Sequence, residues 1–295
     1  MSSLTPITIT HSSGATATIH PFGATVTSFK TSSQKETIFV SRLAKTDGSK
    51  AIRGGIPLAF PQFGRPDASM PQHGFFRCNA WTFGREFDEE GGLKCCDFRL
   101  TLSDVTAARG GRWGDDTVFD FTAVLTVKID ASQLITNLTV KNTGGESFPF
   151  QALFHTYYLV ADDKSMDPSV CHVTGLEGYD VRDQVTGDEY VQCNKPIVLG
   201  KEVDRIYTNL SKPELDVTIG TGNTVSLTAS ATVDGATTPV SVVVWNPYIE
   251  KSKALGDFGD EQYHQMICVE PGVLKNVPVL EGGKEAVFEQ VISVL

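Results

Sequence analysis

Small or apolar residues alternate with Thr, Ser and other polar residues along most of this chain. The alternation is clearest over residues 7–10, 15–20, 24–29, 121–129, 134–141, 225–229, 240–245 and 286–295. These segments are rich in Val, Ile, Thr and Phe, and Gly, Asp, Asn or Pro bound them. Because successive side chains of a strand point to opposite faces, a period of two is typical of strands with one buried face. We therefore predict a set of half-buried antiparallel strands.

Helical periodicity is scarce in the same chain. No segment carries apolar residues at i, i+3, i+4 and i+7 over about twelve residues, although residues 251–263 could hold a short helix. Gly91–Gly92, Gly110–Gly111 and Asp234–Gly235 mark tight turns between strands. No Pro/Ser-rich linker, charge block or internal repeat divides the chain. The sequence therefore predicts an all-β fold, a large antiparallel β-sandwich formed by residues 1–295 as a single domain.

The charge balance narrows the function classes. The chain has 25 Lys and Arg against 35 Asp and Glu, a formal net charge of −10. With no run of basic residues, this surface would repel a phosphodiester backbone. No stretch approaches the roughly 18 consecutive apolar residues of a membrane-spanning helix, and the N-terminus lacks the regions of a secretory signal. We expect a cytoplasmic protein that binds neither nucleic acid nor a membrane.

Cysteine usage agrees with that compartment. The six cysteines show no Cys-x-x-Cys pair and no regular spacing. Cys95 and Cys96 are adjacent, so their side chains would point to opposite faces of a strand, which is a poor arrangement for zinc. We expect reduced thiols and no metal site.

Two loops interrupt the alternation and carry candidate chemistry. Residues 53–64 read Arg-Gly-Gly-Ile-Pro-Leu-Ala-Phe-Pro-Gln-Phe-Gly. Paired glycines allow a backbone to approach a ligand closely, although the pattern matches neither a Walker loop nor GxGxxG. Residues 71–77, Pro-Gln-His-Gly-Phe-Phe-Arg, place the imidazole of His73 four residues before the guanidinium of Arg77. Taken alone, both segments are also compatible with ordinary structural loops.

Three more side chains stand out further along the chain. His155 lies in a mostly apolar segment, which would desolvate the imidazole and bring its pKa near neutrality. Asp204 stands just before an apolar Ile-Tyr pair. Glu270 is expected at the end of a strand, where the following Pro271–Gly272 would turn the chain toward the mouth of a cleft. Each of these groups could equally be a packed histidine or a solvated charge.

As an ordered set, these residues resemble the galactose mutarotase-like superfamily, and within it the hexose-6-phosphate mutarotases, or glucose-6-phosphate 1-epimerases. The resemblance rests on Arg53-Gly-Gly-Ile-Pro, Gln-His73-Gly-x-x-Arg77, Phe-His155-Thr-Tyr, Asp204 and Glu270-Pro-Gly, and also on Gly23-Ala-Thr, Asp47-Gly-Ser-Lys, Val140-Lys-Asn-Thr-Gly and Trp245-Asn-Pro-Tyr. It covers nearly the whole chain. The first two motifs separate this branch from free-galactose mutarotases. The resemblance implies an active cleft on one curved sheet of a large antiparallel β-sandwich, without a metal or an organic cofactor.

The resemblance also implies the chemistry. Mutarotation opens and closes the ring of an aldose, so a base must take the proton of the C1 hydroxyl while an acid protonates the ring oxygen. By resemblance, Glu270 is the base and His155 the acid, on opposite sides of the anomeric centre. An ionised carboxylate and a protonated imidazole stabilise each other's charge near neutral pH. The expected reaction interconverts the α and β anomers of hexose 6-phosphates, chiefly glucose 6-phosphate, in a monomer.

The remaining residues would bind the substrate. By resemblance, His73 would contact the ring oxygen or a neighbouring hydroxyl, and Asp204 would accept a hydrogen bond from a hydroxyl. Arg53 and Arg77 would bind the phosphate, because guanidinium groups match phosphate oxygens in pairs. Lys251 is a further candidate for the phosphate that the sequence leaves open.

Some features and functions also stay open. Phe60, Phe63 and Trp245 could form an apolar platform for the sugar or belong to the core. The bulky Phe75–Phe76 pair could narrow the pocket, and Arg205 could either alter the charge near Asp204 or point away from it. A non-catalytic carbohydrate-binding or regulatory protein on the same fold is the main alternative. A glycoside hydrolase or lyase is less favoured, since a hydrolase normally needs two suitably spaced carboxylates.

Overall fold

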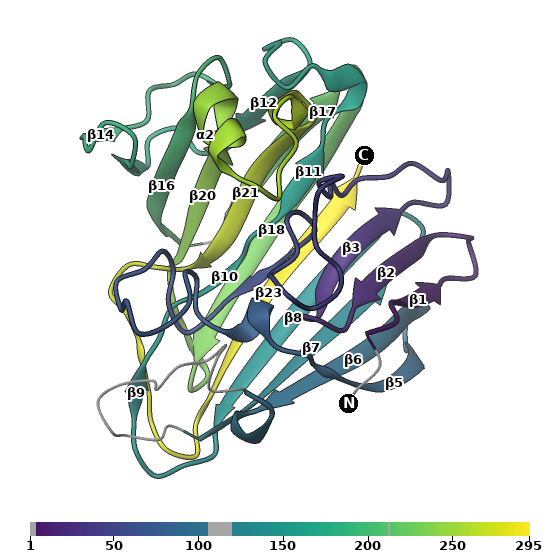
Figure 1. Cartoon of the computed structure of the whole chain (residues 1–295), viewed down its shortest axis with the longest axis vertical. Coiled ribbons are helices and arrows are strands. Elements are labelled where there is room, and N and C mark those ends of the chain that lie inside the picture. The colour runs from purple at the N-terminus through teal and green to yellow at the C-terminus, as the bar shows by residue number, and fades with distance from the viewer. Residues whose placement is uncertain (1–3, 106–119, 212) are drawn as a thin grey trace.

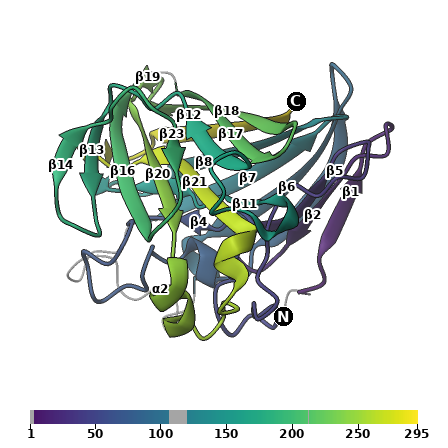
Figure 2. The same cartoon turned by 90° about the horizontal axis from the view of Figure 1, so that it is seen from above.

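The computed structural model describes residues 4–105, 120–211 and 213–295. The turn predicted at Gly110–Gly111 lies outside these ranges. In the described part, the chain forms two large antiparallel sheets, which pack face to face (Figures 1 and 2). A three-stranded sheet lies beside β6 (Leu93–Thr101) of the larger one. This arrangement confirms the predicted all-β fold with large antiparallel sheets.

The larger sheet has ten strands. Its order is β15 (Ile197–Val198), β12 (Cys171–Thr174), β17 (Glu214–Gly220), β18 (Asn223–Val233), β23 (Glu285–Val294), β8 (Gln133–Asn142), β7 (Phe121–Ile129), β6 and β5 (Thr82–Glu89), with β19 (Ala236–Thr237) paired to β18.

The second large sheet has eight strands and carries the candidate site. Its order is β14 (Glu189–Val191), β13 (Asp180–Asp183), β16 (Val203–Leu210), β20 (Val240–Asn246), β21 (Met266–Val273), β10 (Ala152–Phe154) and β4 (Leu58–Ala59), with β11 (Tyr157–Leu159) also paired to β21.

The other elements are short. They are the three-stranded sheet of β1 (Ile7–Thr10), β2 (Thr16–His20) and β3 (Thr25–Lys30), the pair β9 (Phe148–Pro149) and β22 (Val279–Leu280), the helix α2 (Tyr248–Ala254), and the 3-10 turns η1 (Phe76–Cys78), η2 (Leu102–Asp104), η3 (Ala161–Asp163) and η4 (Gln262–Gln265). None of the helices in the described ranges has the length and apolar character needed to cross a membrane.

Every alternating segment singled out in the sequence lies in a strand or overruns it by one residue; the strands are β1, β2, β3, β7, β8, β18, β20 and β23. β7 shows why the pattern is informative, because buried and half-buried residues alternate along its whole length. The short helix expected within residues 251–263 is also present in part, as the end of α2 and the turn η4.

β20 departs from the half-buried expectation, because all seven of its residues are buried. Val242 and Val244 pack into the main core between the sheets. Val243 and Trp245 point to the opposite face, where they join a second apolar cluster. β21 is buried on both faces in the same way. The second face of these two central strands, turned away from the main core, forms the floor of the candidate site.

Candidate active site

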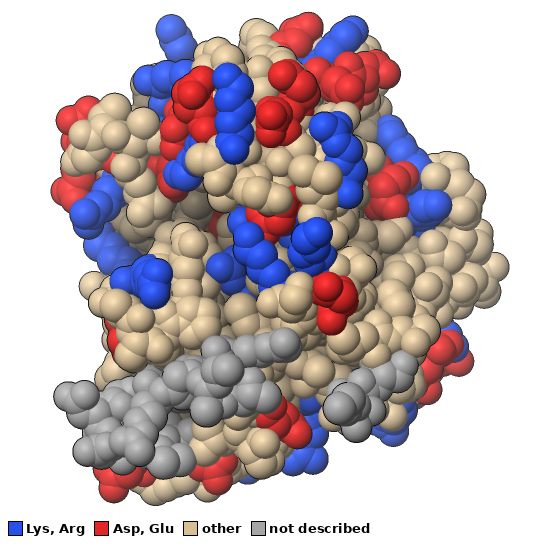
Figure 3. Space-filling model, viewed as in Figure 1, with Lys and Arg blue, Asp and Glu red and all other residues tan. Residues whose placement is uncertain are grey.

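A cleft of about 200 Å³ opens on this second face of the eight-stranded sheet. Its walls come from β16, β20, β21, the segment after β10, the loops around residues 53–77, and α2 with the residue that follows it. The cleft is lined by Arg53, Phe63, Gly64, Gln72, His73, Arg77, His155, Gln184, Asp204, Val243, Trp245, Lys251, Leu255 and Glu270. All six residues named from the sequence are therefore brought together. On the same face as in Figure 1, basic side chains gather beside acidic ones near the middle of the molecule (Figure 3).

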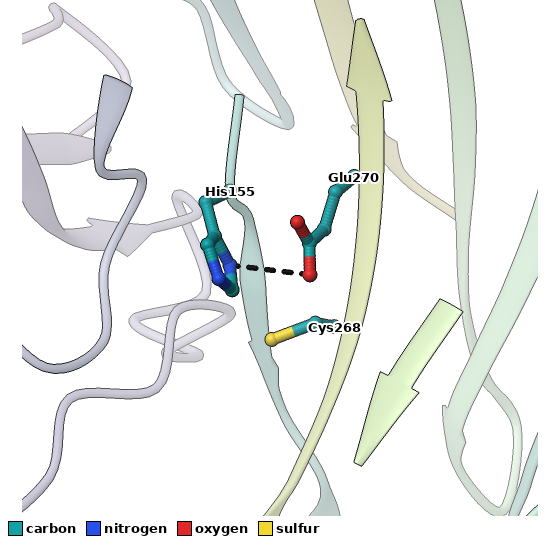
Figure 4. A group of neighbouring side chains, drawn as sticks. All are labelled: His155, Cys268 and Glu270. Atoms are coloured by element: carbon teal, nitrogen blue, oxygen red, sulfur yellow. Dashed lines mark ion pairs between the residues drawn. The ribbon is translucent and has the colours of Figure 1, made fainter. Parts of the chain in front are cut away.

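Strand register brings His155 and Glu270 together. Leu153 on β10 lies opposite Gly272 on β21, and Tyr157 on β11 lies opposite Cys268. The two pairings share one register, so His155, between β10 and β11, stands opposite Glu270. Side chains at opposite positions of an antiparallel pair share a face and lie close together. The Nδ1 atom of His155 is indeed 3.2 Å from Oε1 of Glu270 (Figure 4).

The expected strand end at Glu270 is wrong. β21 continues through Pro271 and Gly272 to Val273, so Glu270 lies within the strand. Pro271 is tolerated because it falls at the break between β10 and β11, where the Phe154 carbonyl accepts a hydrogen bond from Thr156 N instead. A Cβ at Gly272 would come within 2.3 Å of the Ala152 carbonyl oxygen, so glycine permits the close approach of β10.

Both members of the pair are buried, with 6% of His155 and 1% of Glu270 exposed. Neither His155 Nδ1 nor Glu270 Oε2 has a hydrogen-bond partner with good geometry. Unpaired buried polar atoms are costly and are usual only where a function or a ligand uses them. The resemblance implied that the two groups stand on opposite sides of the anomeric carbon. In the structure they lie side by side.

Burial also sets the protonation of the pair. It lowers the pKa of His155 well below its ordinary value, and the charges of Arg77 and Arg53 lower it further. Burial raises the pKa of Glu270 well above its ordinary value, and Asp204 adds to this increase. The free cleft therefore favours a neutral imidazole and a protonated carboxyl. This differs from the near-neutral pKa expected for His155, because the burial of the imidazole lowers its pKa well below the ordinary value and Arg77 and Arg53, which come from a distant segment, add to that effect.

His73 is held as a neutral hydrogen-bond donor. Its Nδ1 atom accepts a hydrogen bond from Gly64 N at 3.1 Å. Burial, with Arg77 and His155 adding to it, lowers the pKa of His73 well below its ordinary value. With Nδ1 used as an acceptor, the neutral ring carries its proton on Nε2. The ring lies 5.5 Å from that of His155, and both rings line the cleft.

Arg53 is fixed by partners distant in sequence. Its Nε donates to Asp257 Oδ1 at 3.1 Å, and its Nη1 donates to the Tyr157 hydroxyl at 3.3 Å. Lys50 binds the other oxygen of Asp257 at 2.8 Å. The two glycines that follow Arg53 lie close against neighbouring backbone. Both have positive φ, and a Cβ on either would collide with the neighbouring backbone of Phe39–Val40 or Val26.

Arg77 contrasts with Arg53. Its Nη2 donates to the Gln72 carbonyl oxygen at 2.7 Å, which orients the guanidinium. Its Nε is buried without a hydrogen-bond partner. Among the residues that the structure describes, no carboxylate forms an ion pair with Arg77. Arg77 therefore brings a positive charge and an unused donor into the cleft, which suits an anionic ligand.

Asp204 lies at another wall of the cleft. Its Oδ1 accepts a hydrogen bond from Gln184 Nε2 at 2.6 Å, and its Oδ2 is 3.4 Å from Lys251 Nζ. Burial raises the pKa of Asp204, although Lys251 and Gln184 act in the opposite direction. Lys251 also pairs with Glu202 at 3.0 Å. Two carboxylates therefore already bind Lys251, which the sequence left open as a phosphate ligand. Arg205 points away from the cleft and pairs with Asp183 at 3.0 Å.

The aromatic residues divide between core and cleft. Phe63 and Trp245 line the cleft, whereas Phe60 is fully buried in the main core. The Phe75–Phe76 pair also belongs to that core, where it packs against Phe60. The pair therefore does not narrow the pocket.

Sequence reasoning missed several contributors. Gln184 lines the cleft, and Asp257 and Tyr157 hold Arg53. No local signal identified Asp257, which lies in a loop after α2 far along the chain from Arg53. His155, Cys268 and Glu270 also place one possible metal-ligand atom each within 4.8 Å of one another.

Fold and cleft together define a class of protein, a β-sandwich with a polar cleft of about 200 Å³ on one antiparallel sheet. The family model "Aldose 1-epimerase" matches residues 6–293, and the chain belongs to this family of isomerases.

The relatives are consistent with that assignment. A protein of Cenchrus ciliaris named "Putative glucose-6-phosphate 1-epimerase" is 32% identical over 91% of this chain and 78% of its own. A protein of the same name from Escherichia coli K12 is 26% identical over 92% of this chain and 84% of its own. The crystal structure of "a putative mutarotase (YeaD) from Salmonella typhimurium" matches with a TM-score of 0.77 and 23% identity, covering 95% of this chain and 87% of that one.

Proposed function

We propose that this protein interconverts the α and β anomers of hexose 6-phosphates, chiefly glucose 6-phosphate. One observation carries the proposal, the presence in a single cleft of the His155–Glu270 pair and of Arg77 without a carboxylate partner. The pair supplies a proton donor and a proton acceptor, and the guanidinium suits a phosphate. The names of the relatives from Cenchrus ciliaris and Escherichia coli agree with this substrate class.

The reaction follows from the pair. Glu270 takes the proton of the C1 hydroxyl while His155 gives a proton to the ring oxygen. The bond between C1 and the ring oxygen breaks, and C1 becomes the carbonyl carbon of the open-chain aldose. After rotation about C1–C2, the former ring oxygen attacks the other face of C1. His155 then takes its proton back, and Glu270 returns its own to the C1 oxygen.

The side-by-side arrangement of the pair suits this exchange. Both reacting oxygens of the sugar are bonded to C1, so they are close neighbours. Two groups 3.2 Å apart can therefore meet both oxygens from one side of the ring. The neutral Nε2–H of His73 is available for the ring oxygen or a neighbouring hydroxyl, and Asp204 can accept from another hydroxyl. Phe63 and Trp245 offer apolar surface to the ring.

A bound phosphate group would also favour the protonated form of His155, the proposed acid. The forward step requires a proton on His155 and a charge on Glu270, whereas the free cleft favours the opposite distribution. Arg77 and Arg53 are among the causes that lower the pKa of His155. A phosphate dianion bound beside them would offset their charges and raise the pKa of His155. The proton can then move from Glu270 to His155 across 3.2 Å. The substrate's own charge would thus favour the reactive state.

The test is anomer exchange measured by NMR on glucose 6-phosphate, with free glucose as the comparison substrate. We expect catalytic amounts of protein to accelerate exchange of the phosphorylated sugar well above the spontaneous rate, and to act more weakly on glucose. Glu270→Gln protein, purified in the same way, controls for a contaminating activity. Binding of glucose 6-phosphate without any acceleration would instead support the alternative of a non-catalytic carbohydrate-binding protein.

A further inference from the structure

Cys268 has no part in the proposed reaction, yet it lies next to the acid–base pair. It precedes Glu270 by two positions on β21, so both side chains point to the same face of the sheet. It is fully buried, between Tyr157 on one neighbouring strand and Trp245 on the other. Figure 4 shows the three side chains of His155, Cys268 and Glu270 turned toward one another. A nitrogen, a sulfur and an oxygen donor therefore lie within 4.8 Å of one another.

The spacing of these donors fits a tetrahedral ion. With Zn–N and Zn–O bonds of about 2.1 Å, a tetrahedral site separates its nitrogen and oxygen ligands by about 3.4 Å. Nδ1 of His155 and Oε1 of Glu270 are 3.2 Å apart. A Zn–S bond of about 2.3 Å places the sulfur about 3.6 Å from each of them. The potential ligand atoms of the three residues lie within 4.8 Å of one another, so small side-chain adjustments would bring the sulfur into place.

The site is also reachable and electrically balanced. His155 and Glu270 line the cleft, through which an ion can approach them, and a water molecule from the cleft would complete its coordination. A bound ion requires the thiolate of Cys268 and the carboxylate of Glu270. These two negative charges neutralise one divalent cation. The bound ion with its ligands therefore adds no net positive charge beside the nearby arginines. All six cysteines are free, and Cys268 is available as a thiol.

We propose that His155, Cys268 and Glu270 form a binding site for Zn²⁺ or a similar thiophilic divalent cation, and that the bound ion inhibits the enzyme. The ion would occupy the imidazole nitrogen and the carboxylate that exchange protons with the sugar. Ion and substrate would therefore exclude each other. The inhibition rests on the proposed function, whereas the binding site does not. The proposed reaction itself makes no use of the ion.

Binding is tested first, without substrate. The protein is stripped of metal and titrated with Zn²⁺ alone by calorimetry and with Co²⁺ by absorption, which reports a thiolate ligand through a near-ultraviolet charge-transfer band. We expect one ion per chain and a cobalt–thiolate band in the wild type. Cys193→Ser removes an exposed thiol elsewhere and should leave both signals unchanged. Cys268→Ser should abolish the band and weaken Zn²⁺ binding by at least tenfold, since even the loss of an outer-shell partner typically costs about 10- to 100-fold.

Inhibition is tested next, by glucose 6-phosphate anomer exchange at increasing Zn²⁺. We expect inhibition of the wild type and of Cys193→Ser that excess substrate relieves, and at least tenfold weaker inhibition of Cys268→Ser. Equal Zn²⁺ affinity in Cys268→Ser and the wild type, or no binding to the wild type, would overturn the site. If Cys268→Ser does not fold, loss of Zn²⁺ binding in His155→Asn tests the same site. A cobalt–thiolate band in a protein without anomer exchange would preserve the site and reject the proposed function.

Discussion

The ring of Tyr157 stacks on the imidazole of His155, with ring centroids 4.8 Å apart and planes inclined by 10°. The hydroxyl of the same tyrosine accepts a hydrogen bond from Arg53 Nη1 at 3.3 Å. One buried side chain therefore contacts both the proposed acid and a proposed phosphate ligand. Under the proposed function, Tyr157 would position both groups, and substitution can separate its two contacts.

Tyr157→Phe keeps the stacked ring and removes the hydrogen bond to Arg53. We expect KM for glucose 6-phosphate to rise by about two- to tenfold, given that hydrogen bonds to charged groups are worth about 1.5 to 3 kcal/mol and this one is long. The value of kcat should change by less than about twofold. Steady-state anomer exchange measures both. Tyr157→Leu also removes the stacked ring and should lower kcat. A fall in kcat for Tyr157→Phe with unchanged KM would contradict this division.

The acid–base pair makes a second prediction. Glu270→Gln and His155→Asn should each lower the rate of anomer exchange by roughly two to four orders of magnitude, because general acid–base groups contribute on that scale. The shapes of the side chains are nearly conserved, so binding of glucose 6-phosphate should persist and can be followed by calorimetry. If both variants fold and keep rates near the wild type, the assignment of these roles is wrong.

The two arginines make a third prediction. Arg77→Ala should reduce kcat/KM for glucose 6-phosphate by about tenfold or more, since the lost charge-assisted hydrogen bonds contribute about 1.5 to 3 kcal/mol. Residual activity on free glucose should change little. Arg53→Ala should act similarly, with an added loss of stability because the buried Asp257 would keep only Lys50 as an ion-pair partner. Arg205→Gln is the matched control, because Arg205 pairs with Asp183 outside the cleft. Equal losses on both sugars would mean that Arg77 shapes the site without binding phosphate.

Asp257 makes a fourth prediction, for stability against pH. Burial would raise the pKa of Asp257, but Arg53 and Lys50 outweigh it and hold the pKa below its ordinary value of 3.8. A carboxyl with a depressed folded-state pKa stabilises the fold above its unfolded pKa and loses that contribution as the pH falls toward the folded value. Asp257→Asn should therefore lower the unfolding free energy by roughly 1 to 3 kcal/mol at pH 7.

The difference in unfolding free energy between Asp257→Asn and the wild type should shrink as the pH falls below about 4. Urea unfolding at several pH values between 7 and 3 measures it. Asp260→Asn changes an exposed carboxylate nearby and should have little effect at any pH. A constant difference between Asp257→Asn and the wild type over this range would show that the charge of Asp257 does not stabilise the fold.

Local pattern was enough for eight of the 23 strands in the described ranges. Residues 121–129 alternate except at Val124 and form β7 with the same bounds. The alternation misled where both faces of a strand are buried. The turn signal Pro-Gly misled where the packing of neighbouring strands keeps the chain extended. β20 is buried on both faces. Pro271–Gly272 stays within β21 because the proline lies opposite the break between β10 and β11, and β10 packs closely against the glycine.

The sequence by itself determined which residue types the cleft could use. Motifs such as Gln-His73-Gly-x-x-Arg77 are contiguous, so their imidazole and guanidinium groups can be recognised from a short stretch of sequence. Only the tertiary structure decided how those groups act. Strand register sets His155 opposite Glu270 with Cys268 beside them, and loop packing gives Arg53 a carboxylate while leaving Arg77 without one among the described residues. Charge state and proton position depend on burial and on neighbours from distant segments, and these exist only once the two sheets have packed together.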